Sequence, residues 1–209
     1  MPKTRSTTKR RRADDGGEAP DGASHAAARL QDASHGGRLS RGLERLWRKG
    51  ERCDVTLRAP AKDGAPAQEV GAHSIVLAAL SPPLERMLLG PMASVSEDGV
   101  LALPEVEPAS LPTVVEYAYT GTLELTQDGM WDVLAACTFL QLEGAVALCT
   151  EFLAEQLAPE NALGVAAAAA HFSCDALERE ALRFAASNLK GVLGTAEWRS
   201  QSAEDVERL

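Results

Sequence analysis

The order of short apolar segments between residues 53 and 121 constrains the fold of this chain more than any other feature. Residues 53–58 alternate apolar and polar side chains, as a half-buried strand does, and residues 68–71 return as the second strand of a hairpin. Residues 74–80 are apolar in a helical pattern that Ser81-Pro82-Pro83 breaks. A second short helix and a strand over residues 100–103 follow, so this part is predicted to mix strands with short helices.

Longer helical patterns occupy the second half of the chain. A helix is expected over 108–119, with Pro112 tolerable only if the helix begins near Ser110. A short edge strand is expected over Leu123-Glu124-Leu125, and two further helices over 128–142 and 144–157. The helix over 128–142 is expected to bury Trp131, Leu134, Ala135, Thr138 and Leu142. More helices follow residue 157, which predicts an α+β domain followed by an all-α one.

Three motifs in these segments resemble those of a BTB/POZ domain of the kelch-like type. The family patterns are C-D-V-x-L, F-x-A-H-R/K-x-V-L-A-A-x-S and Y-x-Y-T-G. The chain carries them in the same order as Cys53-Asp54-Val55-Thr56-Leu57, Val70-Gly71-Ala72-His73-Ser74-Ile75-Val76-Leu77-Ala78-Ala79-Leu80-Ser81 and Tyr117-Ala118-Tyr119-Thr120-Gly121. The resemblance implies a small mixed sheet flanked by short helices, and it makes Asp54 and His73 structural residues.

After residue 157 the chain reads Pro159-Glu160-Asn161-Ala162-Leu163-Gly164-Val165, then His171-Phe172-Ser173-Cys174-Asp175-Ala176-Leu177, then a helix whose Ala181, Phe184, Ala185 and Leu189 share a face. These segments resemble the start of a BACK domain, which follows the BTB domain in kelch-like proteins. The resemblance implies a BTB/POZ domain over 38–157 and a partial BACK domain over 158–209, because the chain stops inside a helix that Ser202-Ala203-Glu204-Asp205 would cap. The sequence contains no kelch repeat. Whether the end at Leu209 is natural or a truncation stays open.

Charge is distributed unevenly along the chain. The formal net charge is −9, and the first twelve residues carry six positive charges, so the remainder carries about −15. An acidic body argues against nucleic-acid binding by the folded part. Residues 1–37 have almost no large apolar side chains and are expected to form a disordered basic tail. Its run Lys9-Arg10-Arg11-Arg12 is either a solvated segment or a nuclear-import signal.

An amphipathic helix is predicted just before the first strand. Its apolar stripe is Leu39, Leu43, Leu46 and Trp47, and Gly50 is a plausible stop. A stripe of this kind needs an apolar partner surface, which is either the chain's own domain or a second molecule. Members of the resembling family form homodimers, and this favours a two-fold dimer interface for these four residues.

The resemblance also implies an adaptor for a cullin-3 RING ubiquitin ligase. Its cullin contact would involve Met87, Leu88, Met92, Ser94 and Tyr119. In the family a glutamate stands where this chain has Ser94, so weak or undetectable cullin binding is expected. The alternative function is a transcriptional regulator that dimerises and recruits co-repressors. Both functions place the protein in the cytoplasm, the nucleus or both.

An enzyme is a third interpretation, with Cys53 or Cys137 as nucleophile and His73 as base. It is disfavoured because no phosphate loop or second carboxylate accompanies Asp54 and His73. The four cysteines have no metal-ligand spacing and are expected to be reduced, mostly buried thiols. The sequence offers no cofactor site, and no apolar run is long enough to cross a bilayer.

Overall fold

The computed structural model describes residues 31–62, 64–91, 93–196 and 198. The chain divides into two units, Met1–Ala33 and Ser34–Leu209. The first unit lies almost wholly outside the described residues, and so does the basic run Lys9-Arg10-Arg11-Arg12. The capping box predicted at residues 202–205 also falls outside them.

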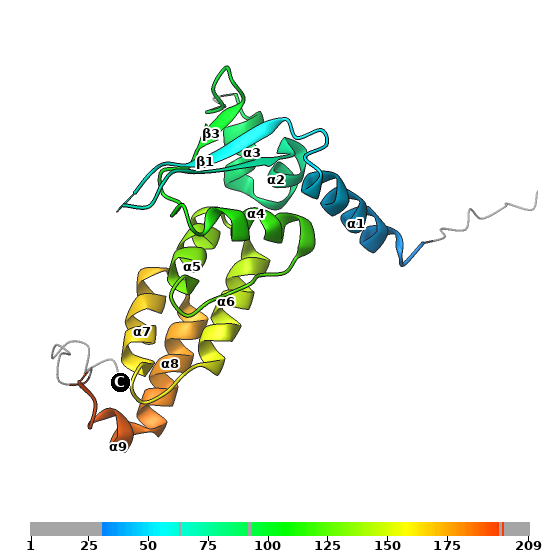
Figure 1. Cartoon of the computed structure of the whole chain (residues 1–209). Helices are drawn as coiled ribbons and strands as arrows, with labels where there is room; N and C mark the ends of the chain where they lie inside the picture. The colour runs from blue at the N-terminus through cyan, green and yellow to red at the C-terminus, as the bar shows by residue number, and fades with distance from the viewer. Residues whose placement is uncertain (1–30, 63, 92, 197, 199–209) are drawn as a thin grey trace, which may run out of the picture. The chain divides into compact units, whose positions relative to one another are not determined.

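A three-stranded mixed sheet forms one part of the second unit (Figure 1). Strand β1 (Val55–Ala59) lies between β2 (Gln68–Ala72), which runs antiparallel to it, and β3 (Val100–Ala102), which runs parallel. Alternate residues of β1 are buried, as the pattern predicted, because strand side chains point to opposite faces. The predicted hairpin and third strand are confirmed.

Two short helices follow β2: α2 (Ser74–Leu80) and α3 (Pro82–Leu89). The prediction that Ser81-Pro82-Pro83 only breaks a helix is incomplete, because the same residues begin the next one. The Ser81 hydroxyl accepts a hydrogen bond from the Leu84 amide (3.1 Å) and donates one to the Leu140 carbonyl (2.6 Å). Proline fits the first turn of α3 because the amide that it lacks would have no helical partner there.

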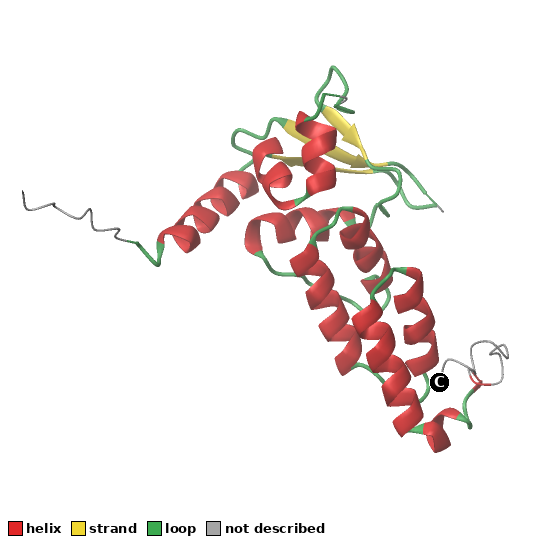
Figure 2. Ribbon diagram, turned by 180° about the vertical axis from the view of Figure 1, so that it is seen from behind, coloured by secondary structure: helices red, strands yellow, loops and turns green. Residues whose placement is uncertain are grey.

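Helices α4 (Leu111–Thr120), α5 (Met130–Phe139) and α6 (Glu143–Glu155) come next (Figure 2 shows the helices and the sheet from behind). Helix α4 begins at Leu111 rather than residue 108, so that Pro112 falls in its first turn. The predicted edge strand over Leu123-Glu124-Leu125 is wrong, since these residues carry no strand hydrogen bonding. Helix α5 ends at Phe139, earlier than the predicted residue 142.

The buried face of α5 also differs from the prediction. Leu134 is buried as expected, but Trp131, Ala135 and Thr138 are only partly buried. Helix α5 packs between α4 and α6, and its apolar residues therefore contact neighbours around much of its circumference; the buried ones are Met130, Val133, Leu134, Ala136 and Cys137. A single amphipathic stripe does not describe a helix that is enclosed in this way.

The C-terminal helices are α7 (Ala162–His171), α8 (Asp175–Ser187) and the short α9 (Leu189–Val192). Helices α7 and α8 pack on each other, and α8 also packs on α6. Val165, Ala169 and Leu177 belong to the same buried cluster as the sheet and α2–α6. The interior therefore continues from the mixed α/β part into the helical part.

Helix α1 (His35–Arg48) is the predicted amphipathic helix, and it begins earlier than residue 38. The Arg38 amide donates to the Ser34 carbonyl, which extends the helix through Gly36 and Gly37. Residues 35–37, which were expected to belong to the disordered tail, are therefore the first residues of α1. Gly50 has a φ of 65°, a left-handed conformation that suits glycine and ends the helical path.

Candidate interaction surface

An open apolar groove lies between α1, α2 and α4. It has a volume of about 380 Å³ and is lined by Gly36, Leu39, Ser40, Leu43, Ile75, Val76, Ala79, Leu80, Ala118 and Tyr119. Three of its apolar side chains face solvent strongly: Leu39 is 56% exposed, Ile75 67% and Leu80 45%. A contiguous exposed apolar surface of this kind is typical of a protein-interaction site.

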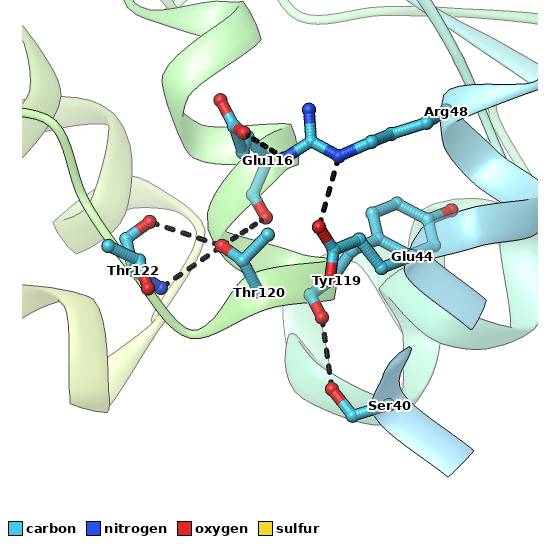
Figure 3. Close-up of polar contacts among 7 residues, drawn as sticks. All are labelled: Ser40, Glu44, Arg48, Glu116, Tyr119, Thr120 and Thr122. Carbon is cyan, nitrogen blue, oxygen red and sulfur yellow. Dashed lines mark hydrogen bonds and ion pairs between the residues drawn. The ribbon is translucent and has the colours of Figure 1, made fainter. Parts of the chain in front are cut away.

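Polar contacts hold α1 on α4 beside this groove (Figure 3). The Ser40 hydroxyl donates to the Tyr119 carbonyl at 3.1 Å. The Arg48 guanidinium binds Glu116 on α4 at 2.7 Å and Glu44 on its own helix at 3.0 Å. Helix α1 is thus attached to α4 of the same chain at two points along its length, Ser40 and Arg48.

Trp47 strengthens this attachment. Its ring stacks on that of Tyr119 with centroids 4.7 Å apart and an interplanar angle of 4°. Its Nε1 donates to the Gly71 carbonyl at 3.0 Å. Leu43 also packs against the core cluster, whereas Leu39 is mostly exposed. Leu43 and Trp47 thus contact the chain's own domain, whereas the Leu39 side chain faces solvent. Leu46 is half-buried.

Tyr119 lies at the centre of a buried hydrogen-bond network. Its hydroxyl accepts from the His73 backbone amide at 2.8 Å and lies 2.9 Å from His73 Nδ1, while His73 Nε2 lies 2.9 Å from the Glu51 carbonyl. Burial raises the pKa of Tyr119 to about 12. Tyr119 is only 3% exposed, and this contradicts its prediction as a cullin contact, since its side chain is committed to the interior.

Asp54 connects the sheet to α2. Its two carboxylate oxygens accept from the Ser74 amide at 2.7 Å and the Ser74 hydroxyl at 2.6 Å. Partial burial acts to raise the pKa of Asp54, but the two hydrogen bonds from Ser74 outweigh it and hold this pKa below its usual range. A carboxylate at the first turn of a helix also interacts favourably with the helix dipole.

These contacts do not activate Cys53 or Cys137, the two nucleophiles that the enzyme interpretation names. Both ring nitrogens of His73 are within hydrogen-bond distance of Tyr119 or Glu51. Burial raises the pKa of Cys53, and the hydrogen bond to Cys149 together with burial raises that of Cys137. Neither thiol is therefore predisposed to form the thiolate that nucleophilic attack needs. Three of the four cysteines are buried, as expected, and Cys53 is half-buried.

The predicted cullin contact lies around α3 and the loop after it. Met87 is half-buried, Leu88 is buried, and Met92 lies outside the described residues. Ser94 is exposed, and its backbone amide donates to the Met87 carbonyl at 2.9 Å, which ties the loop to α3. The apolar side chain that α3 presents to solvent is Leu89, at 55% exposure.

Sequence reasoning missed Ile75, Leu80 and Leu89 as surface residues. All three lie in short helices that are rich in apolar residues, with Glu85 and Arg86 the charged residues of α3, so composition alone does not tell which apolar side chains are exposed. Helical spacing could have separated the two sides of α2. Ile75 and Ala79 are four residues apart and therefore share one face, while Leu77 and Ala78 lie on the buried face.

A second concave region, of about 550 Å³, lies between α5, α6 and α7. Trp131 and Phe172 line it, with ring centroids 6.2 Å apart. In the described part of the chain no group of three or more His, Cys, Asp or Glu side chains is placed to hold a metal ion. Among those same residues, no helix combines the length and apolar character that crossing a membrane requires.

Comparison with known proteins agrees with this arrangement. Residues 43–157 match the family described as the BTB/POZ domain. Kelch-like protein 28 of Mus musculus is 31% identical over 175 residues, covering 84% of this chain and 29% of that protein. Kelch-like protein 17 of Rattus norvegicus is 32% identical over 156 residues, covering 75% and 23%. Kelch-like protein 2 of Homo sapiens is 34% identical over 154 residues, covering 74% and 25%.

The chain thus spans less than a third of the length of these relatives. Its match to the BTB/POZ family covers more than half of its own residues and includes the sheet, α2–α6 and the C-terminal part of α1. The chain therefore belongs to the BTB/POZ domain family.

Proposed function

We propose that this protein is a homodimeric interaction module and that a second copy of the chain covers the groove between α1, α2 and α4. The observation that carries the proposal is the exposure of Leu39, Ile75 and Leu80 along one continuous apolar groove. Because α1 and α2 form the two sides of the groove, each copy could insert one of its own helices into the groove of the other copy. Such mutual insertion is the self-complementary contact that a two-fold axis requires.

The mass of the full 209-residue chain in solution tests this proposal. Light scattering or sedimentation equilibrium at micromolar concentration is expected to give twice the mass of the chain. A single-chain mass throughout that concentration range would refute it.

We also propose an adaptor role like that of kelch-like proteins, with the α3 surface contacting the N-terminal domain of cullin-3. Leu89 supplies an exposed apolar side chain, and the hydrogen bond from the Ser94 amide to Met87 holds the following loop against α3. Ser94 offers no carboxylate, and a missing charge-assisted hydrogen bond costs about 1.5–3 kcal/mol. Cullin binding by the natural sequence is therefore expected to be weak.

A calorimetric titration with purified cullin-3 N-terminal domain tests this second contact. Because the Ser94 side chain is exposed and its backbone amide holds the loop, Ser94→Glu adds a carboxylate without removing a structural contact. It is expected to strengthen binding by about tenfold or more. Leu89→Asp should abolish the gain, and Leu39→Asp serves as the control on the other surface. Tight binding by the natural chain that neither α3-region substitution alters would contradict the assignment.

The proposed domain limits follow the same resemblance. We assign 38–157 to the BTB domain, with α1 beginning slightly earlier, and α7–α9 to the start of a BACK domain. The basic run Lys9-Arg10-Arg11-Arg12 remains the candidate for nuclear import. Comparing the localisation of a fluorescent fusion before and after substitution of these four residues by alanine tests that assignment.

A further inference from the structure

The two helices that wall the groove are joined through one side chain. Helices α1 and α2 each pack against α4, where Tyr119 lies. The Tyr119 ring stacks on Trp47 near the end of α1. Its hydroxyl binds His73, the residue directly before α2, and the other nitrogen of that imidazole reaches the carbonyl of Glu51, just after α1. The contacts form a closed path from one wall to the other.

The hydrogen-bond partners along this path assign the donor and acceptor roles of the His73 ring nitrogens. The Glu51 carbonyl can only accept, so the ring proton of a neutral His73 lies on Nε2, and the Tyr119 hydroxyl, which accepts from the His73 backbone amide, donates its proton to Nδ1. Nδ1 is then an acceptor, and Nε2 carries the ring proton and donates to the Glu51 carbonyl. This neutral tautomer satisfies every donor in the network. A protonated imidazole would leave the buried Tyr119 hydroxyl without that acceptor.

We propose that Tyr119 is the positioning residue of the groove: it sets the separation of α1 and α2 that a second copy needs, with Trp47 as its anchor on α1. The inference rests on the proposed dimer and changes the role of two predicted contact residues. Tyr119 acts through His73 and Trp47 rather than by touching a partner. Trp47 holds α1 to its own chain, and Leu39 and Ile75 make the contact with the second copy.

The expected weakening of the dimer depends on the competent fraction, which is the fraction of chains that hold α1 and α2 in the arrangement needed for binding. If only a fraction of the chains holds α1 and α2 in the binding arrangement, the apparent dissociation constant rises by the inverse of that fraction for each partner. Both chains of a dimer must be competent, so the dissociation constant of the dimer rises by the inverse square of the competent fraction. A fall of the competent fraction to about one third therefore weakens the dimer by about tenfold.

Tyr119→Phe in the full chain tests the proposal, because it keeps the ring that stacks on Trp47 and removes the hydroxyl. Tyr117→Phe is the matched control. It removes a hydroxyl from the same helix, two residues away, and that hydroxyl lies beside Gly144 rather than beside His73. Sedimentation velocity is expected to show a dimer weakened by about tenfold for Tyr119→Phe and unchanged for Tyr117→Phe. An unchanged dissociation constant for both variants would overturn the proposal.

A second readout is independent of dimerisation. In a Leu39→Asp/Ile75→Asp background, Tyr119→Phe is expected to accelerate amide hydrogen exchange in α1 more than in α5 or α6. Equal acceleration in all helices would mean a purely structural role and would overturn the inference. Should the unaltered chain prove monomeric, the dimer proposal fails, while this exchange comparison still decides whether Tyr119 positions α1.

The unaltered protein supplies a third measurement that needs no variant of Tyr119. Nitrogen-15 spectra of the His73 imidazole at neutral pH are expected to show Nε2 protonated and Nδ1 unprotonated. An imidazolium, or the tautomer with the proton on Nδ1, would contradict the hydrogen-bond path and with it the positioning role.

Discussion

Replacing Leu39 and Ile75 by aspartate is expected to convert the protein from a dimer into a monomer. Both side chains line the groove, and neither belongs to the buried core. Leu39 and Ile75 are 56% and 67% exposed. They are better targets than Leu43 and Trp47, whose replacement would also detach α1 from its own domain.

The magnitude follows from the surface that dimerisation would cover. Fully burying a leucine or isoleucine side chain contributes about 2 kcal/mol, so covering the exposed fractions of these two contributes about 2.5 kcal/mol per chain. A two-fold interface doubles this to about 5 kcal/mol, which corresponds to three or four orders of magnitude in the dissociation constant. Aspartate adds the unfavourable burial of a charge, so this is a lower bound.

Sedimentation velocity over a concentration series measures the effect, and circular dichroism verifies that the variant is folded. Leu89→Asp is the matched control, because Leu89 is 55% exposed on α3 and does not line the groove. A folded double variant that still dimerises like the unaltered chain would refute the reasoning. Equal weakening by Leu89→Asp would refute it as well, since the effect would then be unrelated to the groove.

Two further predictions concern stability. Ser81→Ala is expected to lower the free energy of unfolding by about 2–4 kcal/mol, because it removes the cap of α3 and leaves the Leu140 carbonyl without this donor. Urea denaturation should show a lower midpoint at an unchanged slope. Ser110→Ala is the control, because the Ser110 hydroxyl donates to the nearby Glu107 carbonyl, and a Ser81→Ala loss of stability no larger than that of the control would contradict the prediction. Asp54→Asn is expected to cost about 1 kcal/mol at neutral pH by weakening the contact with α2. Since the folded-state pKa of Asp54 lies below its ordinary value of 3.8, this difference should be complete above pH 3.8 and should vanish as the pH falls through the lower folded-state pKa. A difference that persists in stronger acid would show that the charge of Asp54 is not the cause.

The sequence predicted those parts of the fold that depend on local rules. The hairpin of β1 and β2 and the limits of α2 follow from alternation and helical spacing, and the structure agrees with them. The proline pair after Ser81 was harder to interpret, because proline both ends a helix and occupies the first turn of another. The environment of α5 is set by the neighbouring helices α4 and α6, so no pattern within α5 itself predicts that Trp131 is more exposed than Val133.

The candidate site was predictable only in part. The stripe on α1 was found, but the division between residues that hold α1 and residues that face outward depends on where Tyr119 and Gly71 lie in space. Tyr119 shows the limit of reasoning from a motif. Resemblance singled out the residue, whereas only the hydrogen-bond geometry shows that its hydroxyl points inward to His73.

The strand order has a consequence for how the chain reaches this structure. Strand β1 pairs locally with β2, but its other edge pairs in parallel with β3, and α2 and α3 lie between them in sequence. Closing that longer loop is entropically unfavourable, so the pairing of β1 with β3 is expected to form late. Until then one edge of β1, with the apolar residues Val55 and Leu57, stays open to pairing with other chains. Early formation of α2 and α3, which shortens that loop, is therefore expected to reduce the time for which this edge can pair with other chains.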